Sequence, residues 1–358
     1  MKIKYWDETK NSTVQLVSTR SVKIGEFRDC SFTGICPHYP QILMRSQNEL
    51  LLPTIERFMS LGRGTVYEKT MKWEPPREVL KQHEDSPVFF FCYNTANYFH
   101  WLYDTVPYLF SYFKLKTVLP NLKLLMSPPE GKIDLYPFVY ETLSLLGIKE
   151  TDIVFVDNYT KYDKVFIGSS LTHNRLSLEP PHPALWDIIK KIKSPVKDTP
   201  KKVYVSRRTW VKDDNKNIGT DYTIQRKCVN EDSVVDLFKK NGFVEVFAED
   251  LSMSEKVSTF ANADVVAGPI GGGMANLLFS NKDTKVISIN SPEFFPTNER
   301  LKNAMLHTDI TFFDDTKFVD RVDDKVTHQN ALSISGGLNS PWEVDINKLE
   351  TLLQSVLN

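Results

Sequence analysis

The stretch that most constrains the fold runs from Ala263 to Ser280, with the sequence ADVVAGPIGGGMANLLFS. A short β-branched run leads into Gly268 and Pro269, and a glycine triplet then precedes an apolar segment. This order predicts a strand, a glycine turn and a helix. Glycines accept positive φ and let a ligand approach the backbone, and a first helical turn leaves N–H groups unpaired at the positive end of the dipole. A phosphate group suits that place, and a tight turn without a ligand is the alternative.

The bulk composition places this turn in an ordinary globular protein. At 358 residues the chain exceeds one typical core, so we expect two domains. A charged content of 25% that nearly cancels, to a net charge of −1, gives no reason to expect nucleic acid as a partner. The four cysteines lack metal-ligand spacing and are expected to be reduced thiols. We expect no signal peptide or transmembrane segment and a cytoplasmic location, with peripheral attachment to a membrane left open.

Segments with strand and helix spacing alternate along most of the chain. The apolar run at 88–92 has the composition of a buried strand and precedes an aromatic segment with helical spacing, and the alternation restarts after residue 200. Such alternation predicts an α/β fold with parallel sheets. The Pro-containing stretch at 194–200 predicts a boundary, so we expect a first domain at 1–195, with a β-rich start, and a second domain at 196–358.

Three local signals predict where helices begin, end or bend. Ser252 and Glu255 have the spacing of a capping box at a helix start. Asn241 and Gly242 form a C-terminal signal for the preceding helix. Pro107 is expected to break or kink the aromatic-rich helix of the first domain. The first two signals place two helices before the strand that leads to the glycine turn.

His100 and Asp104 lie four residues apart on the predicted aromatic-rich helix and therefore share a face. Two interpretations of this pair stay open. The two side chains could satisfy one another in a purely structural role. Alternatively, the carboxylate could orient the imidazole and raise its basicity, which gives a general base near neutral pH.

Arginines stand at junctions between predicted elements in the half that carries the glycine turn. Arg207 and Arg208 follow a predicted strand, and Arg226 precedes a predicted helix. Open α/β sheets bind ligands at the carboxyl ends of their strands, and guanidinium groups suit a diphosphate. Surface ion pairs are the alternative for each arginine, and we favour that alternative for Arg208. Glu231 could accept hydrogen bonds from ribose hydroxyls, although acidic residues in a first helical turn are also common because of the helix dipole.

The order of these motifs resembles glycosyltransferase family 61, which includes protein O-linked N-acetylglucosaminyl- and xylosyltransferases and many bacterial polysaccharide enzymes. The matching stretches are NYFHWLYDTVPYL at 97–109, YVSRR at 204–208, RKCVNED at 226–232 and the segment at 249–280. The resemblance implies a GT-B fold, with two Rossmann-like domains that face each other across a cleft. It also implies a nucleotide-sugar donor held by the C-terminal domain, inversion at the anomeric carbon and no obligatory metal, in agreement with the lack of a DxD motif.

One position departs from the family's pattern. Family members commonly carry a histidine in a glycine motif of the form GPHGAGL-x-N, and this chain has Ile270 at that place. If that histidine contacts the donor, this protein binds its donor differently, uses another donor or has lost activity.

We therefore expect an inverting, metal-independent glycosyltransferase, a hexosyl- or pentosyltransferase without a cofactor, that moves a sugar from a nucleotide sugar to a hydroxyl of a glycan or glycoconjugate. We expect UDP as the nucleotide. His100 with Asp104 is the expected catalytic base, and Asp104 or Glu179 acting directly is the reserve. The weaker candidates for acceptor contacts are Asn97, Trp101 and Glu179. The expected donor contacts are Arg207, Arg226, Glu231, Gly271, Gly272, Gly273, Met274 and Asn276.

Two other classes of protein are the alternatives to this expectation. A dinucleotide-dependent oxidoreductase would place GxGxxG after a first strand, with an acidic residue about 20 positions on, and GGGMAN does not fit that pattern. A non-catalytic nucleotide- or glycan-binding GT-B protein stays open. Turnover distinguishes it from an enzyme, because a binding protein would show nucleotide affinity without donor hydrolysis or transfer.

Overall fold

The computed structural model divides the chain into two compact units. The C-terminal unit comprises Met1–Leu16 together with Lys193–Asn358, and the N-terminal unit comprises Val17–Ile192. The residues that the structure describes are 2–6, 12–13, 20–35, 42–46, 49–50, 81–83, 86–129, 131–157, 159–172, 180–195, 198–208, 227–292, 299–319 and 340–358.

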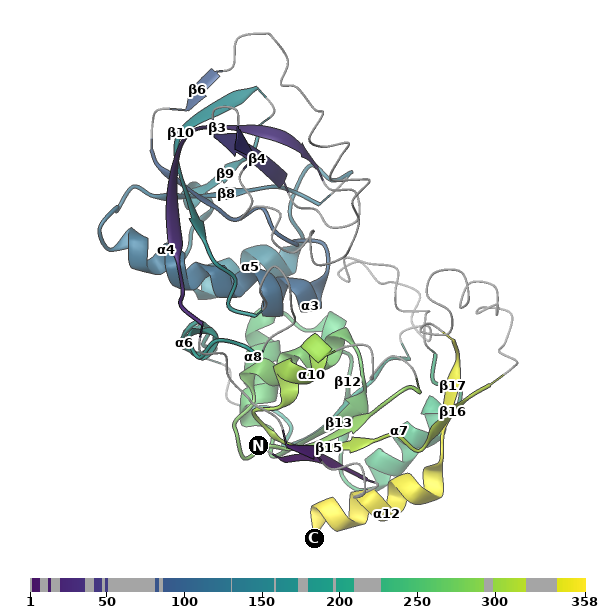
Figure 1. The fold of residues 1–358 in the computed structure, drawn as a ribbon. Helices are drawn as coiled ribbons and strands as arrows, with labels where there is room; N and C mark the ends of the chain where they lie inside the picture. The colour runs from purple at the N-terminus through teal and green to yellow at the C-terminus, as the bar shows by residue number, and fades with distance from the viewer. Residues whose placement is uncertain are drawn as a thin grey trace. The chain divides into compact units, whose positions relative to one another are not determined.

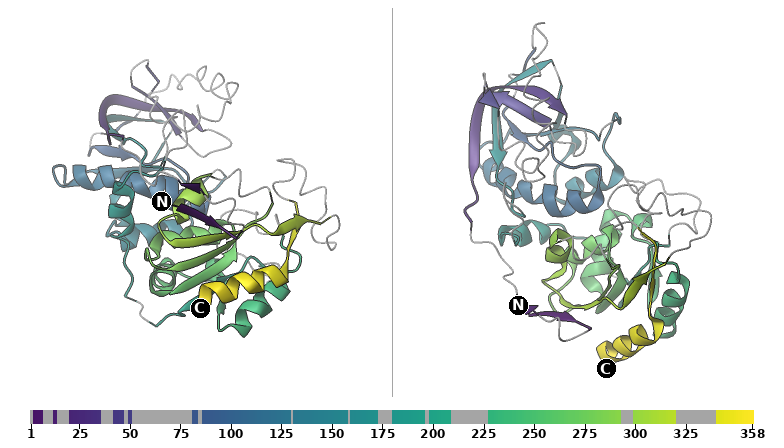
Figure 2. Two further views of the ribbon diagram at one scale, coloured as in Figure 1. Left: turned by 60° about the horizontal axis from the view of Figure 1, so that its bottom comes forward. Right: turned by 45° about the vertical axis from the view of Figure 1, so that its right-hand side comes forward.

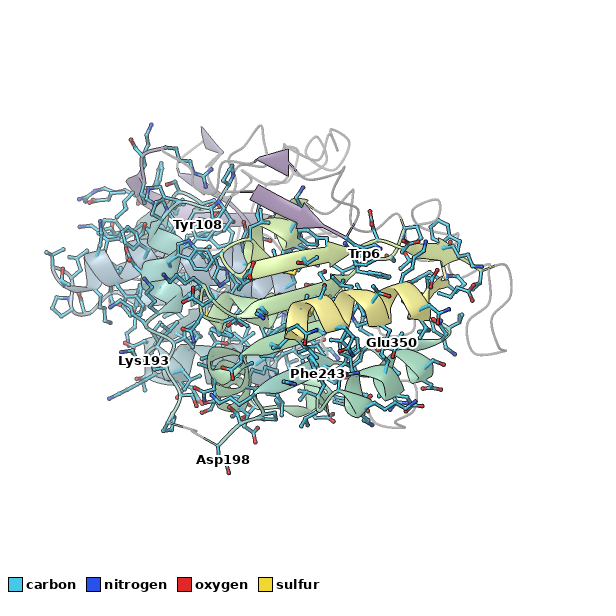
Figure 3. The ribbon with its side chains drawn as sticks, turned by 90° about the horizontal axis from the view of Figure 1, so that it is seen from below. Trp6, Tyr108, Lys193, Asp198, Phe243 and Glu350 are labelled. Carbon is cyan, nitrogen blue, oxygen red and sulfur yellow. The ribbon has the colours of Figure 1, made fainter. Side chains whose placement is uncertain are left out.

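The first residues of the chain belong to the C-terminal unit, whereas we had expected them in a first domain at 1–195. β1 (Lys2–Tyr5) pairs in parallel with β15 (Asp309–Phe313). The N–H of Trp6 donates to the carbonyl oxygen of Phe312 at 2.8 Å, and the Trp6 ring lies 6.4 Å from that of Phe313. Trp6 is labelled in Figure 3. These contacts extend the C-terminal sheet by a strand that is distant in sequence.

The sheet of the C-terminal unit has the order β12-β11-β13-β14-β15-β1-β2 and is parallel except at its β2 edge. Its further strands are β2 (Ser12–Thr13), β11 (Lys202–Val205), β12 (Val244–Val246), β13 (Val265–Pro269) and β14 (Lys285–Ile289). A separate antiparallel pair consists of β16 (Thr316–Phe318) and β17 (Trp342–Val344). All five residues of β13 are buried, as expected for a parallel strand that is covered on both faces.

Helices cover both faces of this sheet (Figures 1 and 2). α7 and α12 lie together on one face, where Phe238 and Leu349 join Ile287 in the hydrophobic core. α8, η9 and α10 pack together and cover the other face. The helical elements of this unit are α7 (Glu231–Lys240), η8 (Ala248–Asp250), α8 (Met253–Asn262), η9 (Gly272–Phe279), α10 (Glu299–Met305) and α12 (Ile346–Leu357).

The predicted helix boundaries of this unit are confirmed. The Ser252 side chain accepts a hydrogen bond from the N–H of Glu255, whose carboxylate accepts one from the N–H of Ser252 at 2.8 Å. α7 ends before Gly242, which has φ +82°, the left-handed conformation that favours glycine after a helix. The C-terminal helix α12 begins at Ile346, because Trp342–Val344 pairs as β17 and the Asp345 side chain caps the helix.

The N-terminal unit contains a mixed sheet with the main order β5-β4-β3-β10-β7-β8-β9, and β6 pairs with β10. β10 is parallel to β6 and β7, as are β7 to β8 and β8 to β9, whereas β3, β4 and β5 pair antiparallel. Only part of this sheet therefore has the parallel arrangement expected of a Rossmann-like domain. The strands are β3 (Ile24–Ile35), β4 (Ile42–Ser46), β5 (Glu49–Leu50), β6 (Lys81–His83), β7 (Val88–Phe90), β8 (Lys123–Met126), β9 (Ile153–Phe155) and β10 (Thr160–Gly168).

The aromatic-rich segment after β7 is helical but irregular. It passes through α3 (Tyr98–His100), the π-helical turn η3 (Trp101–Thr105) and the 3₁₀ turn η4 (Val106–Tyr108) before α4 (Leu109–Lys116). The break expected at Pro107 is confirmed, since the regular α-helix starts only two residues after it. The other helical elements of this unit are α5 (Pro137–Leu145), η5 (Glu150–Asp152) and α6 (Ala184–Ile189).

Candidate active site

The order of the strands reverses where the parallel strands β11 and β13 lie side by side. The chain leaves β11 through α7 toward β12 on one side, and it leaves β13 through η9 toward β14 on the other side. Such a reversal of strand order opens a ligand-binding crevice at the carboxyl ends of the two strands. Arg207 follows β11 at this point, and the glycine turn follows β13.

The Arg207 side chain reaches from the end of β11 to the glycine turn. Its Nη1 donates a hydrogen bond to the carbonyl oxygen of Ile270 at 3.0 Å. A Cβ atom on Gly271 would lie 2.0 Å from that Nη1, so a side chain there would displace the guanidinium. Burial lowers the pKa of Arg207 and the carboxylates of Glu231 and Glu249 oppose the shift. The guanidinium therefore stays charged beside the turn.

Close packing explains two further glycines. A Cβ atom on Gly268 would lie 2.5 Å from the carbonyl oxygen of Val205, and one on Gly273 would lie 2.9 Å from the Val205 Cγ1. Gly271 has φ 170°, which is extended backbone, and positive φ occurs at other glycines of the described chain. Of the glycine properties that suit such a turn, the structure shows close approach, because Val205 and Arg207 lie too near for side chains at Gly268, Gly271 and Gly273.

Gly272 is different from its neighbours. It is exposed, and a Cβ atom placed on it would meet no atom of the described residues within 4 Å. Neither packing against the described residues nor backbone conformation therefore accounts for a glycine at this position. The open space beside its backbone lies at the start of η9, where the first N–H groups of a helix point outward. A ligand that approaches the backbone here would account for the missing side chain.

Two of the residues that were expected to contact the sugar donor are buried. Met274 is fully buried, and its N–H donates to the carbonyl oxygen of Gly271 at 3.0 Å, which closes the first turn of η9. Asn276 is also buried, and its Nδ2 donates to the carbonyl oxygen of Gly273 at 2.9 Å. The N–H of Met274 is thus already engaged, which leaves residues 271–273 as the backbone donors that could meet a phosphate.

Glu231 lies in the first turn of α7, behind Arg207. Its Oε1 accepts three hydrogen bonds, from the N–H of Arg207 at 2.7 Å, the Tyr204 hydroxyl at 3.3 Å and the Ser206 hydroxyl at 3.4 Å. The residue is only 1% exposed. Burial raises the pKa of Glu231 to about 7, although the hydrogen bond and the charge of Arg207 oppose this shift. The carboxyl group thus fixes the backbone that carries Arg207.

Arg208 has the structural role that we favoured for it. Its Nε and Nη2 donate to the two oxygens of Glu245 at 2.6 Å and 2.7 Å, and its Nη1 donates to Asp232 at 2.6 Å. Burial alone would raise the pKa of Glu245, but hydrogen bonds from Arg208 and Lys239 outweigh it and lower the pKa to about 2. The Arg208 guanidinium is therefore committed to a bidentate ion pair that ties β11 to β12.

The N-terminal unit brings His100 and Asp104 together at the carboxyl edge of β7. The Nδ1 of His100 lies 2.7 Å from Oδ2 of Asp104, and Oδ1 of Asp104 accepts a hydrogen bond from the Thr172 hydroxyl at 3.3 Å. The Asp104 side chain is 4% exposed and the His100 side chain 22%. Since a neutral imidazole that donates from Nδ1 has its lone pair on Nε2, this contact favours Nε2 as the basic atom.

Local hydrogen bonds hold this pair in place. Asn97 caps α3, because its side chain accepts from the N–H of His100 at 3.2 Å. Oδ1 of Asn94 accepts from the N–H of Asn97 at 2.9 Å, and the carbonyl oxygen of Asn94 accepts from the Thr105 hydroxyl at 3.0 Å. His100 directly precedes the π-helical turn and Asp104 lies within it, and such a distortion is frequent at functional sites. The position expected to contact the acceptor, Asn97, thus supports the His100 backbone.

Trp101 does not fit its expected role as an acceptor contact. It is fully buried, its Nε1 donates to the Thr142 hydroxyl at 3.1 Å, and its ring packs edge-on against Phe91 at 5.7 Å. The sequence signal was ambiguous because a tryptophan next to a polar pair occurs in cores as well as in sugar sites. Two other expected residues, Arg226 and Glu179, lie outside the described residues.

Sequence reasoning missed the hydroxyls that complete both hydrogen-bonded clusters. Thr172 lies 68 residues from Asp104 and follows β10, so no local pattern connects them. Tyr204 and Ser206 stand two residues apart within the YVSRR stretch, and a strand places such residues on one face. That alternation was the available signal for the cluster around Glu231.

Within the described ranges of the chain, no helix is both long and apolar enough to cross a membrane. In the same ranges, no three His, Cys, Asp or Glu side chains gather so that they could hold a metal ion. Metal independence stays a prediction that only a measurement can test.

Residues 98–287 match the family model described as Glycosyltransferase 61, which spans more than half of the chain. The chain belongs to glycosyltransferase family 61. No curated protein sequence matches the chain. The matched range of this family 61 member includes the His100 pair, Arg207, Glu231 and the whole glycine turn. Both clusters therefore fall within the part of the sequence that defines the family, which supports glycosyl transfer from a nucleotide-sugar donor to an acceptor.

Proposed function

We propose that this family 61 member is an inverting, metal-independent glycosyltransferase that moves a hexose or pentose from a UDP-sugar to a hydroxyl of a glycan or glycoconjugate. The C-terminal unit binds the donor, and the N-terminal unit supplies the catalytic base. The GT-B architecture implied by the resemblance is part of this proposal.

Gly272 is the observation that carries the donor site. The packing of β11 and Arg207 explains its glycine neighbours, whereas the space beside Gly272 is open. A diphosphate oxygen in that space would meet the first N–H groups of η9 and the charge of Arg207 together. The position at the reversal of strand order supports the same site.

The reaction is a single displacement at the anomeric carbon. The acceptor oxygen forms a bond to that carbon while the bond from the carbon to the diphosphate oxygen breaks, so the configuration inverts. Nε2 of His100 takes the acceptor proton, and Asp104 stabilises the imidazolium that results. The electron pair of the broken bond leaves with UDP, and Arg207 with the turn N–H groups stabilises the negative charge that develops.

Isothermal titration with UDP tests the donor site. Gly272→Asp places a carboxylate in the open space and is expected to weaken UDP binding at least a hundredfold. Lys282→Gln is the matched control, because it changes the net charge by the same −1 at an exposed position just after η9. Its affinity for UDP should stay within twofold of the wild type. Unchanged UDP affinity in Gly272→Asp would place the donor elsewhere.

A non-catalytic nucleotide-binding protein is the second candidate, favoured by the replacement of the family's usual histidine by Ile270. The Ile270 side chain is only 3% exposed, and this residue contacts Arg207 through its backbone carbonyl oxygen. UDP affinity without release of UDP from any UDP-sugar would support this candidate over an enzyme.

A further inference from the structure

Asn94 lies in the loop that leads from β7 to α3 in the N-terminal unit, and only 5% of it is exposed. Its Oδ1 accepts hydrogen bonds from the N–H of Ala96 at 3.1 Å and from the N–H of Asn97 at 2.9 Å. Its backbone carbonyl oxygen accepts from the Thr105 hydroxyl at 3.0 Å. Three hydrogen bonds therefore fix both the backbone and the side chain of this loop residue.

The amide nitrogen of Asn94 is accessible and has no partner. Only an oxygen accepts from two N–H groups, so the contacts of Oδ1 fix which branch of the amide is the nitrogen Nδ2. Within the ranges that the structure describes, no group accepts a hydrogen bond from Nδ2. Nδ2 is also absent from the fully buried unpaired polar atoms of those ranges, so the exposed part of Asn94 includes this nitrogen. The side chain cannot rotate without losing both bonds to Oδ1.

The same hydrogen bonds connect Asn94 to the proposed catalytic base. Oδ1 of Asn94 holds the N–H of Asn97, and Oδ1 of Asn97 holds the N–H of His100 at 3.2 Å. The bond from the Thr105 hydroxyl reaches the residue that directly follows Asp104. β7 is parallel to both of its neighbours, β10 and β8, so this loop leaves the sheet at the carboxyl ends of parallel strands. Ligands of α/β sheets bind at that edge.

Nδ2 of Asn94 and Nε2 of His100 need opposite partners. Nε2 carries the lone pair that takes the proton of the attacking hydroxyl, because Nδ1 faces Asp104. Nδ2 can only donate and therefore needs an oxygen that accepts. A sugar ring has hydroxyls on adjacent carbons, so one hydroxyl can donate to Nε2 while its neighbour accepts from Nδ2. A serine or threonine side chain has a single hydroxyl and offers no such second oxygen.

We propose that Nδ2 of Asn94 donates a hydrogen bond to the acceptor hydroxyl adjacent to the attacking one, and that Asn94 thereby selects a sugar ring as the acceptor. The inference rests on the proposed function and narrows its acceptor to a sugar with two adjacent hydroxyls. A site built to hydrogen-bond a substrate hydroxyl discriminates strongly against an analogue that lacks it, because the donor of the protein is then left unpaired.

Acceptor-dependent release of UDP from UDP-sugars tests this inference. The probes are p-nitrophenyl glycosides of glucose, galactose, N-acetylglucosamine and xylose, followed by the monodeoxy analogues of the glycoside that reacts fastest. Loss of the hydroxyl that contacts Asn94 should lower kcat/KM for the acceptor by roughly tenfold in the wild type. The KM for the UDP-sugar should stay within about twofold, because the donor site lies in the other unit.

Asn94→Ser removes the NH₂ group and keeps a side-chain oxygen that can accept from the same backbone N–H groups. With the complete glycoside, kcat/KM for the acceptor should fall by roughly tenfold. The same deoxy analogue should then cost little more, because both changes remove one hydrogen bond. Thr105→Val is the matched control, since it removes another bond of this loop and leaves Nδ2 in place. It should keep the deoxy penalty of the wild type.

A measurement on the wild type requires no substitution at Asn94. In protein labelled with ¹⁵N at asparagine and saturated with UDP, the side-chain amide signal of Asn94 should shift when the glycoside is added. The analogue without the contacted hydroxyl should leave that signal unchanged. A signal that moves equally with both compounds, or with neither, would contradict the contact even where Asn94→Ser does not fold.

The outcomes separate this inference from the proposed function. The inference alone fails if the losses from Asn94→Ser and from the deoxy analogue are additive, or if no deoxy analogue reacts more slowly than its parent. It fails equally if UDP-sugars are turned over but only water or a serine or threonine peptide accepts the sugar. Loss of the deoxy penalty in Thr105→Val would reduce Asn94 to a support of the loop. Absence of UDP release from every UDP-sugar would overturn the proposed function and this inference with it.

Discussion

Arg207 donates a hydrogen bond from Nη1 to the carbonyl oxygen of Ile270, at 3.0 Å, and thereby joins the carboxyl ends of β11 and β13. The bond depends on Gly271, because a Cβ atom there would lie 2.0 Å from the same nitrogen. The position of one positive charge at the proposed donor site is thus set by a missing side chain in the turn that follows the neighbouring strand.

Gly271→Ala should weaken UDP binding through Arg207. The added methyl displaces the guanidinium, and the loss of a charge-assisted hydrogen bond corresponds to a roughly ten- to hundredfold weaker affinity. Arg207→Ala should have a similar effect. A double-mutant cycle measured by titration calorimetry distinguishes this from independent damage: Gly271→Ala should add little in the Arg207→Ala background. Fully additive losses would mean that the methyl acts directly on the ligand.

Arg208→Ala should separate stability from activity. It leaves Glu245, which is 8% exposed, without its bidentate partner, so the free energy of unfolding should fall by about 1–3 kcal/mol. Urea denaturation measures that loss. Transfer activity per folded molecule should stay within twofold of the wild type, whereas Arg207→Ala should lower it by orders of magnitude. A large loss of activity in folded Arg208→Ala would bring Arg208 into the donor site.

Substitutions along the hydrogen-bonded series His100, Asp104 and Thr172 should lower transfer activity by successively smaller amounts. His100→Ala should lower kcat by about 10²–10⁴, because it removes the proton acceptor. It should leave UDP affinity nearly unchanged, because the proposed UDP site lies in the C-terminal unit and His100 in the N-terminal unit. Asp104→Asn should cost less, and Thr172→Val less again. Activity depends on an unprotonated base, so the acidic limb of the kcat/KM profile should disappear in His100→Ala. An unchanged acidic limb with good activity would mean that the proton leaves by another route.

His307 should make the protein less stable in acid. Its Nε2 lies 3.2 Å from the carbonyl oxygen of Ser280, the residue that follows η9, and burial lowers its pKa from an ordinary 6.5 to about 4. The unfolded chain therefore binds this proton more tightly, and the stability from neutral His307 is lost as the pH falls from about 6.5 to 4. The loss should reach roughly 3 kcal/mol.

Urea denaturation of the wild type and His307→Gln at several pH values isolates this contribution, because the carboxylates titrate in both proteins. The difference in unfolding free energy between the two should shrink or change sign as the pH falls from 6.5 to 4. A difference that does not vary with pH over this range would contradict the assignment to His307.

The elements around the glycine turn were predictable because their signals are local. The capping box of Ser252 and Glu255, the left-handed Gly242 and the break at Pro107 each depend on residues within a few positions. The order of strand, glycine turn and helix at 265–279 was predictable for the same reason, although the helix is of the 3₁₀ type. Local propensity and the special geometry of glycine and proline decide such features.

Features that depend on distant pairing were not predictable. β1 joins β15 across most of the chain, and a short N-terminal strand carries no signal for its partner. Thr172 reaches Asp104 only because β10 and β7 are neighbours. The burial of Trp101 depends on Phe91 and Thr142, which no spacing in the sequence connects to it. The reason for each glycine also required the structure, since the distances to Val205 and Arg207 are contacts between strands.

Release of UDP from a panel of UDP-hexoses and UDP-pentoses, measured in excess EDTA with and without glycan acceptors, tests the central claim most directly. We predict that at least one donor gives acceptor-dependent UDP release that EDTA does not reduce, and that His100→Ala and Arg207→Ala each abolish it while remaining folded. Activity that is lost in EDTA and restored by Mn²⁺ or Mg²⁺ would contradict the arginine-based mechanism, and UDP binding without release from any donor would contradict the assignment as an enzyme.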